Sequence, residues 1–245
     1  DNFNKKKEAM GENAHPVLVK EHEGTTLINQ VNASYASMVS SMDENIGKIL
    51  IFLNENGLDK NTFIIFTSDN GGLSTLGRGR IAPTSVRPLR AGKGWCYEGG
   101  IRVPLIIAGP GIKPGTECSF PVTGADFYPT ILSLASLPLR PEQHIDGIDL
   151  SPLLLKGIEP ERRTIFWHYP HYHGSAWTPG AAIRKGDWKL IEFYDSAKVE
   201  LYNLADDEGE TEDLSEKYPE RKEELLRELK MLQEKTRFNR YIEKE

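Results

Sequence analysis

The chain has 245 residues and a formal net charge of −6, with acidic and basic side chains close to balance. That length can bury a hydrophobic core, as one large domain or as a domain with a smaller one attached. The mildly acidic balance argues against a broad basic face for nucleic acid, and no window approaches the roughly 18 apolar residues of a membrane-spanning helix. No signal peptide is visible, and the first residue is Asp1, so we expect a processed or truncated product.

Residues 1–31 are polar and broken by glycine and proline, which predicts a surface segment. From residue 32 to residue 56, apolar residues recur at steps of three and four, the period of an amphipathic helix. Asn56 and Gly57 end this pattern as the end of a helix commonly does. We therefore expect a long helix here, followed by a strand.

That strand opens the stretch TFIIFTSDNGG at residues 62–72. The apolar run Phe63–Phe66 suits a strand that is buried on both faces, as in a parallel sheet. Asp69 and Asn70 follow where the strand ends, which is where ligand sites lie in open α/β sheets. Their side-chain oxygens suit a hard cation such as Ca²⁺ or Mg²⁺. An ordinary Asp-Asn-Gly turn is the alternative.

The next loop, residues 73–93, is long and rich in arginine and glycine, which is typical of functional or disordered segments. Arg90 is the last of its arginines, and both an anion-binding role and an ordinary surface position are open. Lys93 stands between two glycines, which weaken helices and strands alike. Its side chain could bring a point charge to a bound oxyanion, although a solvated loop lysine has the same pattern.

A second apolar strand is predicted over residues 103–108, and Asp126 has the position of a helix N-cap. After Lys156 and Gly157 the sequence indicates short strands and one helix. We therefore predict two domains, an α/β domain over residues 1–155 and a smaller α+β subdomain over residues 156–245.

The subdomain begins with an apolar stretch that leads into His168, His171 and His173, which alternate with aromatic residues. A zinc site is one interpretation, but Pro170 lies inside the motif and no fourth ligand is evident. Imidazoles and aromatic rings pair well with the faces and hydroxyls of sugars. The pattern favours a substrate-facing loop, with ordinary packing as the alternative.

The rest of the subdomain is predicted as a small antiparallel sheet with one packed helix. Residues 181–184 and 188–194 indicate a hairpin, and residues 200–204 a further strand. The acidic run at residues 206–213 lacks the spacing of an EF-hand, so we expect a solvated loop. Leucines at helical spacing predict the last helix over residues 219–235.

The order SDNG, then GKG-x-x-YEGG-x-RVP and an apolar strand, resembles the formylglycine-dependent sulfatases of the alkaline phosphatase-like superfamily. The resemblance continues in SYASMVSSMDENIGKIL before these motifs and in ADFYPTILSLASLP, AAIRKGDWKLI and ELYNL after them. It covers the back half to two-thirds of such an enzyme. It implies an α/β fold, with a mixed or parallel sheet flanked by helices and a small C-terminal subdomain of antiparallel sheet plus helix.

The resemblance implies a sulfuric ester hydrolase that acts on a sulfate monoester, and we expect a sulfated carbohydrate or another sulfated small molecule as substrate. By the same likeness, Asp69 and Asn70 are half of a site for Ca²⁺, with Mg²⁺ as the alternative ion. Lys93 matches the lysine that contacts the substrate sulfate group. Metal electrostatics and a positioned cation are central to this chemistry.

The resemblance also places the histidine loop over the active site, so we expect His168, His171 and His173 to contact the substrate together with Arg90. Secretion or a periplasmic location is implied in the same way.

The nucleophile of the family is absent from this sequence. Formylglycine forms from a cysteine in a Cys-x-Pro-x-Arg motif, and neither Cys96 nor Cys118 has that context. Formylglycine is therefore expected only in a missing N-terminal part, either as a segment of a longer chain or as a partner chain. We expect the isolated chain to be inactive and to bind calcium weakly. Whether the two cysteines pair or stay free is open.

Two other functions compete with this prediction. A phosphatase or phosphodiesterase of the same superfamily would use similar carboxylates, although its two-metal sites add a histidine pair that the SDNG region lacks. A non-catalytic homologue could instead bind sulfated glycans through the arginine and histidine loops.

Overall fold

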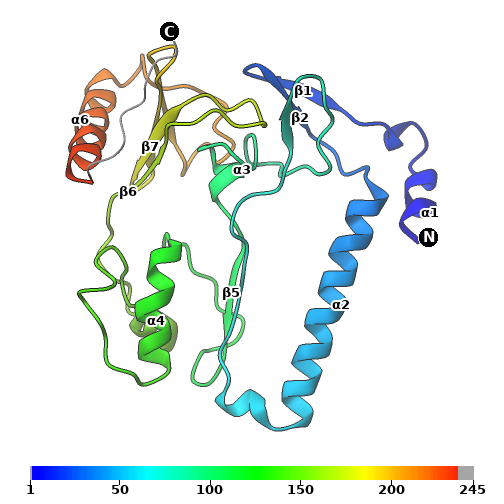
Figure 1. Cartoon of the computed structure of the whole chain (residues 1–245), viewed down its shortest axis with the longest axis vertical. Coiled ribbons are helices and arrows are strands. Elements are labelled where there is room, and N and C mark those ends of the chain that lie inside the picture. The colour runs from blue at the N-terminus through cyan, green and yellow to red at the C-terminus, as the bar shows by residue number, and fades with distance from the viewer. Residues whose placement is uncertain (1, 237–245) are drawn as a thin grey trace. The chain divides into compact units, whose positions relative to one another are not determined.

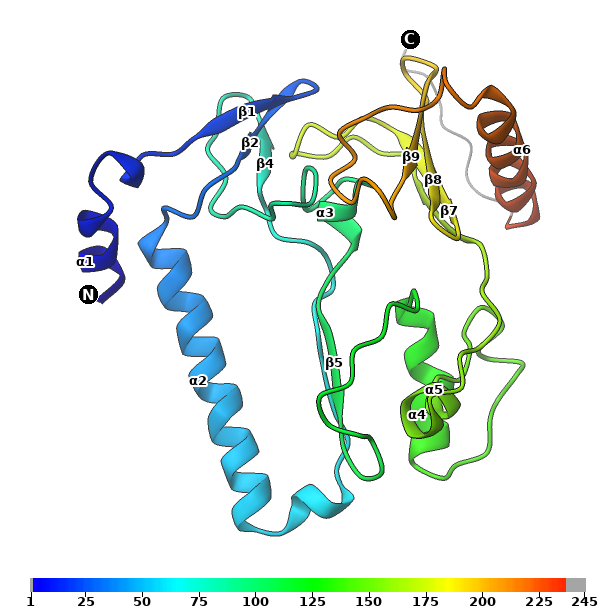
Figure 2. The same ribbon diagram turned by 180° about the vertical axis from the view of Figure 1, so that it is seen from behind.

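The computed structural model describes residues 2–236, and Figures 1 and 2 show the chain from opposite sides. The α-helices are α1 (Asn2–Ala9), α2 (Ala33–Glu55), α3 (Glu98–Ile101), α4 (Phe127–Leu134), α5 (Ser151–Lys156) and α6 (Pro219–Lys235). The strands are β1 (Leu18–Glu21), β2 (Gly24–Leu27), β3 (Ile64–Thr67), β4 (Thr75–Gly77), β5 (Leu105–Ala108), β6 (Ile165–Tyr169), β7 (Gly180–Lys185), β8 (Trp188–Phe193) and β9 (Lys198–Asn203). Short 3₁₀ helices precede β1, β3 and α4.

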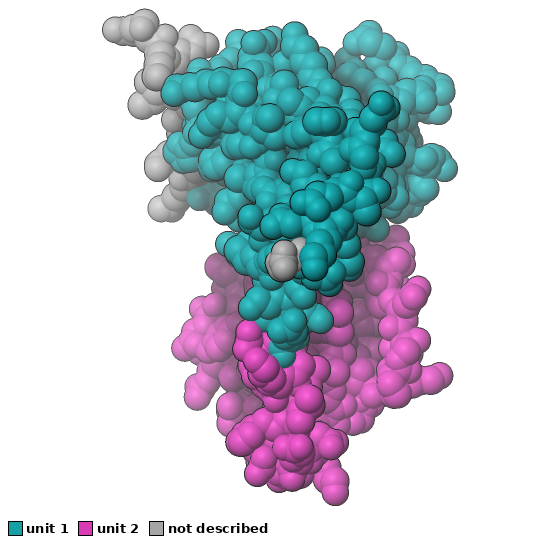
Figure 3. Space-filling model, turned by 90° about the vertical axis from the view of Figure 1, so that its right-hand side faces the viewer, with its two compact units in different colours: residues 1–44, 68–104, 163–245 teal, residues 45–67, 105–162 magenta. Residues whose placement is uncertain are grey.

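The contacts divide the chain into two compact units, which Figure 3 shows in different colours. Unit 1 contains residues 1–44, 68–104 and 163–245, and unit 2 contains residues 45–67 and 105–162. The predicted division after residue 155 follows the order of the sequence, whereas the units join residues 68–104 to the C-terminal sheet. The loop with the sulfatase motifs thus belongs to the same unit as the histidine loop.

The core of unit 1 is the antiparallel sheet β6-β7-β8-β9, in that spatial order. Alternation along the strands sends every second side chain to the face covered by α6 (Figure 2). On that face a buried cluster forms from Ala181, Ile183, Leu190, Leu201, Leu225 and Leu229. The predicted hairpin, the further strand and the last helix are confirmed.

The other face of the same sheet is covered by the segment that contains Lys93. Ala182, Ile191, Phe193 and Tyr202 point to this face, where they pack against a second buried cluster that includes Ala91, Trp95, Tyr97 and Trp177. In this cluster Trp95 stacks on Tyr97 and meets Trp177 edge to edge, and Trp177 lies tilted against Phe193. The backbone that carries Lys93 is thereby fixed on the sheet.

Strands β1, β2 and β4 form a smaller antiparallel sheet in unit 1. The predicted surface segment 1–31 therefore contains a hairpin, and Leu27 within it is only 1% exposed because it packs with Val31 and Ala82. The two-residue turn between β1 and β2 carries His22 into contact with Trp95.

In unit 2, β3 pairs with β5 in antiparallel register, with Ile64 opposite Ala108 and Thr67 opposite Leu105. The predicted parallel pairing and two-sided burial of this strand are wrong for the described residues. The chain returns through residues 68–104 to run back beside β3, and β3 is only half-buried because β5 is its one paired neighbour within residues 2–236.

The long helix α2 forms where the sequence predicts it, but none of its residues is buried. Its apolar positions stay open to solvent, and Met38, Ile49 and Phe52 are 61%, 59% and 58% exposed. Within residues 2–236 no helix is both long enough and apolar enough to cross a bilayer.

Candidate functional site

Two glycine-rich segments of unit 1, residues 68–72 and 90–100, lie directly against each other. The backbone N–H of Gly71 donates to the carbonyl oxygen of Gly100 at 2.9 Å. A Cβ atom at residue 71 would lie 1.7 Å from the carbonyl oxygen of Gly99. The two backbones can come this close only because no side chain separates them.

A second contact joins the same segments next to the lysine. The backbone N–H of Lys93 donates to the carbonyl oxygen of Gly72 at 2.9 Å. A Cβ atom at residue 92 would lie 2.4 Å from that same oxygen, so residue 92 must also be glycine. Backbone contacts between glycines thus bring the predicted metal segment and the lysine loop together.

The predicted metal ligands sit on the first of these segments. Asp69 is exposed and Asn70 is half-buried. The Asn70 amide nitrogen donates to the carbonyl of Gly71 at 3.1 Å, so its amide oxygen is the atom of this side chain that could accept a cation. Among residues 2–236, no group of three or more His, Cys, Asp or Glu side chains could hold a metal ion. These two residues therefore fit only part of a shell that takes about six to eight oxygens around Ca²⁺.

The ring of His173 lies against Gly94, the residue that follows Lys93. The Lys93 side chain is exposed, and a Cβ atom at residue 94 would be 2.1 Å from Nδ1 of His173. Burial and, to a lesser degree, the charge of Lys93 lower the pKa of His173 below its ordinary value. The site thus combines a charged amine with an imidazole that is neutral at pH 7.

Ser175 fixes the tautomer of that imidazole. Its backbone N–H donates to His173 Nδ1 at 3.2 Å, and its hydroxyl lies 2.8 Å from the same atom. Because Nδ1 accepts, the proton of the neutral ring is on Nε2. His173 is therefore presented as a hydrogen-bond donor next to Lys93.

The other two predicted histidines have different surroundings. His168 Nδ1 lies 2.9 Å from the hydroxyl of Tyr194, which also accepts from Gln233 of α6 at 2.8 Å. His171 is exposed and its ring contacts Tyr169 edge to edge. The contacts of His168 are those of a packed structural residue, so its predicted role in substrate binding gains no support, while His171 is open to solvent.

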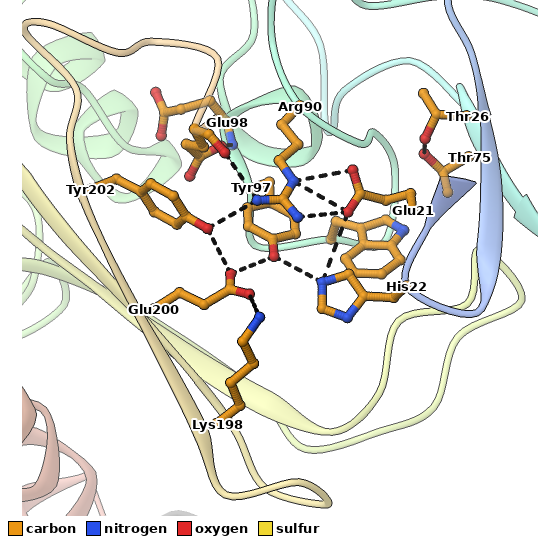
Figure 4. A network of polar contacts seen from close by, with 12 residues as sticks. Glu21, His22, Thr26, Thr75, Arg90, Tyr97, Glu98, Lys198, Glu200 and Tyr202 are labelled. Carbon is orange, nitrogen blue, oxygen red and sulfur yellow. Dashed lines mark hydrogen bonds and ion pairs between the residues drawn. The ribbon is translucent and has the colours of Figure 1, made fainter. Parts of the chain in front are cut away.

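Arg90 is tied into the interior of unit 1 (Figure 4). Its guanidinium pairs with Glu21 at 2.8 Å, donates to the Tyr202 hydroxyl and to the Glu210 carbonyl at 2.9 Å each, and lies 4.0 Å above the ring of Tyr97. Burial, the largest single influence, would lower the pKa of Arg90, but the hydrogen bond to Glu21 and the charges of Tyr97, Tyr202 and Glu21 together outweigh it and raise the pKa. These partners give Arg90 a structural role and do not favour the predicted substrate contact.

Glu200 is the centre of the adjoining polar network in Figure 4. Its carboxylate accepts from the hydroxyls of Tyr97 at 2.5 Å and Tyr202 at 2.9 Å, and pairs with Lys198 at 2.6 Å. Because Tyr97 donates to Glu200, it accepts from His22 Nε2 at 2.9 Å. Burial would raise the pKa of Glu200, but these hydrogen bonds and the charge of Arg90 together outweigh it and lower the pKa.

The acidic run at residues 206–213 differs from the prediction of a solvated loop at one position. The side chain of Glu210 is fully buried, where it accepts the backbone N–H of Glu98 at 2.6 Å and pairs with Lys189 at 2.8 Å. The sequence around Glu210 has no periodicity that would distinguish it from its exposed neighbours, so composition alone cannot find it.

Both cysteines are free thiols. Cys96 is buried and burial raises the pKa of its thiol to about 12, which removes it from nucleophilic chemistry at neutral pH.

Comparison with known proteins identifies the family of the chain. Residues 1–137 match the family model of the sulfatases, and residues 91–237 match that of the C-terminal part of N-sulphoglucosamine sulphohydrolase. The chain belongs to the sulfatase family. The resemblance read from the SDNG and GKG motifs is thereby confirmed.

Curated sulfatases share about a third of the chain's residues over a long alignment. A sulfatase of Formosa agariphila is 36% identical over 206 residues, which cover 76% of this chain and 36% of that protein. Arylsulfatase K of Danio rerio is 32% identical over 197 residues, which cover 79% of this chain and 35% of that protein. The chain thus spans about a third of the length of the curated sulfatases it matches.

Solved structures confirm the fold class. The structure of Ps i-CgsB in complex with k-i-k-neocarrahexaose matches with a TM-score of 0.68 at 30% identity, covering 93% of this chain and 46% of that one. BT4656 in complex with D-glucosamine-2-N, 6-O-disulfate matches with a TM-score of 0.70 at 30% identity, covering 87% of this chain and 42% of that one.

Proposed function

We propose that the chain forms part of the active site of a sulfuric ester hydrolase that acts on a sulfated carbohydrate. The observation that carries this proposal is the meeting of Lys93, His173 and the Asp69–Asn70 segment in one compact unit of a sulfatase-family chain. The complex of BT4656 with a disulfated glucosamine supports a sulfated sugar as the substrate class.

Lys93 supplies the charge in this proposal. Its side chain is exposed, and its backbone N–H is held by the Gly72 carbonyl, so the amine can approach the oxygens of a sulfate ester as a charge-assisted donor. His173 donates through Nε2–H to a sugar oxygen or to the ester, which adds orientation to the charge of Lys93. His171 borders the same loop. We do not include Arg90 and His168 among the substrate contacts, because Arg90 pairs with Glu21 and His168 lies within hydrogen-bond distance of Tyr194.

Asp69 and Asn70 would hold Ca²⁺, or Mg²⁺ in its place, as two of its oxygen ligands. A bound cation of this kind polarises the ester oxygens. Formylglycine has no place on this chain, because neither Cys96 nor Cys118 lies in a Cys-x-Pro-x-Arg motif and the Cys96 thiol is buried. We expect no turnover of an aryl sulfate by the 245-residue chain alone, and turnover at an enzyme's ordinary rate would contradict this.

We also propose that a further α/β segment, upstream in the same polypeptide or on a partner chain, completes the site. The open apolar face of α2 supports this, because exposed apolar surface of this extent usually marks an interface. The intact denatured mass of the protein from its native source separates the two arrangements. Following the same family likeness, we propose a secreted or periplasmic protein, which fractionation of source cells would check.

The test of the proposed function is binding of glucosamine 6-sulfate to the purified chain in the presence of Ca²⁺, followed by calorimetry. We expect Lys93→Ala to weaken binding roughly tenfold, the effect of losing a charge-assisted hydrogen bond of about 1.5–3 kcal/mol. The matched control is Lys113→Ala, an exposed loop lysine of unit 2. Equal affinities of the wild type and Lys93→Ala would refute the proposed sulfate contact.

Two further titrations separate the competing functions. Tighter binding of glucosamine 6-phosphate than of the sulfate would favour a phosphatase of the same superfamily. Affinity for the sulfated sugar that is unchanged by EDTA would favour a non-catalytic glycan-binding role. Under the proposed function, the sulfate binds more tightly than the phosphate, and EDTA weakens its binding.

A further inference from the structure

Glu210 contacts two groups of polar residues: the network around Arg90, and the ion pairs of Glu98 and Lys189. Its carboxylate accepts the backbone N–H of Glu98 at 2.6 Å and lies 2.8 Å from Lys189 Nζ. Its backbone carbonyl accepts from Arg90 Nη1 at 2.9 Å. The side chains of Glu210 and Lys189 are both 0% exposed, so these contacts have no competing water.

The charges around Glu210 are balanced. Lys189 Nζ also donates to Glu98 Oε1 at 2.9 Å, and Arg184 lies 3.8 Å from Glu98 Oε2. Two buried carboxylates therefore share one site with the buried Lys189 and the partly exposed Arg184. Removal of one member leaves an uncompensated buried charge, which makes the cluster strongly sensitive to substitution.

The residues that Glu210 holds are the two ends of the segment that carries Lys93. Arg90 begins this segment, and Glu98 ends it as the first residue of α3. The two ends are also tied to each other, because the N–H of Gly99 donates to the Arg90 carbonyl at 2.9 Å. Glu210 thus contacts both ends of the loop formed by residues 90–98, and Lys93 lies near the middle of that loop.

We infer that Glu210 is a positioning residue for Lys93. By holding both ends of the 90–98 loop, it fixes the loop against the Asp69–Asn70 segment and so sets where the Lys93 amine lies. This inference rests on the proposed function for its consequence in substrate binding. The positioning itself can be measured without any ligand.

The measurement is amide hydrogen exchange of the 245-residue chain, read residue by residue in Glu210→Ala and Glu210→Gln. In Glu210→Ala we expect protection of the Gly71, Lys93 and Gly99 amides to fall tenfold or more, while amides of β7 and β8 keep theirs. Glu210→Gln should recover part of the protection, because its amide oxygen can still accept from Glu98. The matched control is Glu208→Ala, an acid of the same segment whose side chain is half exposed.

An equal loss of protection in β7 and β8 would mean that Glu210 only stabilises the unit as a whole, and no loss at the three loop amides would mean that it does not hold the loop. Either result overturns the inference. If Glu210→Ala proves too unstable to study, Glu210→Gln decides alone, through the same contrast between loop and sheet amides.

Affinity for glucosamine 6-sulfate gives the second readout. We expect Glu210→Ala to weaken it at least fivefold and Glu208→Ala to leave it within twofold. A wild-type chain that binds no sulfated sugar would refute the proposed function, while the exchange experiment would still decide the positioning.

Discussion

Arg90 and Glu21, which are 69 residues apart in the sequence, form a two-point ion pair in the interior of unit 1. Arg90 Nη2 lies 2.8 Å from Oε1 of Glu21, and Nε lies 3.1 Å from Oε2. The pair joins the β1–β2 hairpin to the start of the Lys93 loop. A flat guanidinium is needed for this geometry, since a lysine amine cannot reach two oxygens and two further acceptors at once.

Arg90→Lys should therefore destabilise the chain by about 2 kcal/mol or more, because it leaves buried acceptors without partners. Chemical denaturation followed by tryptophan fluorescence measures this change. The control is Arg102→Lys, since Arg102 pairs with Glu208 at 3.3 Å on the surface, and its cost should stay within about 0.5 kcal/mol. Equal effects of the two substitutions would contradict the structural role of Arg90.

Gly94→Ala should damage both stability and sugar binding. Residue 94 has a φ of +85°, and its new Cβ would meet the ring of His173. Gly79→Ala is the matched control, because Gly79 has a φ of +66° with nothing within 4 Å of an added Cβ. The control should lose roughly 1–2 kcal/mol from the left-handed backbone alone, and Gly94→Ala about 1–3 kcal/mol more through overpacking. If both variants bind glucosamine 6-sulfate as the wild type does, His173 is not part of the site.

Gly71→Ala and Gly47→Ala should have effects of opposite sign. At residue 71 the added Cβ meets fixed backbone, so we expect a loss of about 3 kcal/mol or more. Gly47 lies inside α2 with open space around it, and alanine there should gain about 0.5–1 kcal/mol from its helix propensity. Thermal unfolding of both variants measures the two changes. A neutral Gly71→Ala would show that the two segments are not in backbone contact.

The lowered pKa of Glu200 predicts how the stability of the chain depends on pH. Its pKa is lowered below the ordinary 4.5 in the folded chain, so the unfolded chain binds a proton more readily. The stability that Glu200 contributes is therefore complete above pH 4.5 and is lost as the pH falls below that value towards the folded pKa. Glu200→Gln should lower stability at neutral pH and flatten its decline below pH 4.5. Glu234→Gln, an exposed acid on α6, should leave the pH profile unchanged.

Elements with a clear period were predictable from the sequence. Helix α6 begins at Pro219 and ends at Lys235 as its leucine spacing indicates, and the β7–β8 hairpin forms around the Lys185-Gly186-Asp187 turn. Side-chain periodicity reports which face of an element is buried, and here the tertiary packing agrees with it.

The partners of individual charged residues were not predictable in this way. The sequence predicts a substrate contact for Arg90 and a solvated position for Glu210, because composition does not report which one of several like charges meets a buried partner. The pairing of β3 with β5 was missed because a short apolar run carries no information about strand direction.

The close approach of residues 68–72 and 90–100 has a consequence for how new substrate preferences could arise. The spacing between the Asp69–Asn70 segment and Lys93 is set by main-chain atoms, with glycines at the contacts. Neighbouring surface side chains such as that of His171 take no part in that spacing. Under the proposed function, such positions can therefore be exchanged to recognise a different sugar while Lys93 and the Asp69–Asn70 segment keep their separation.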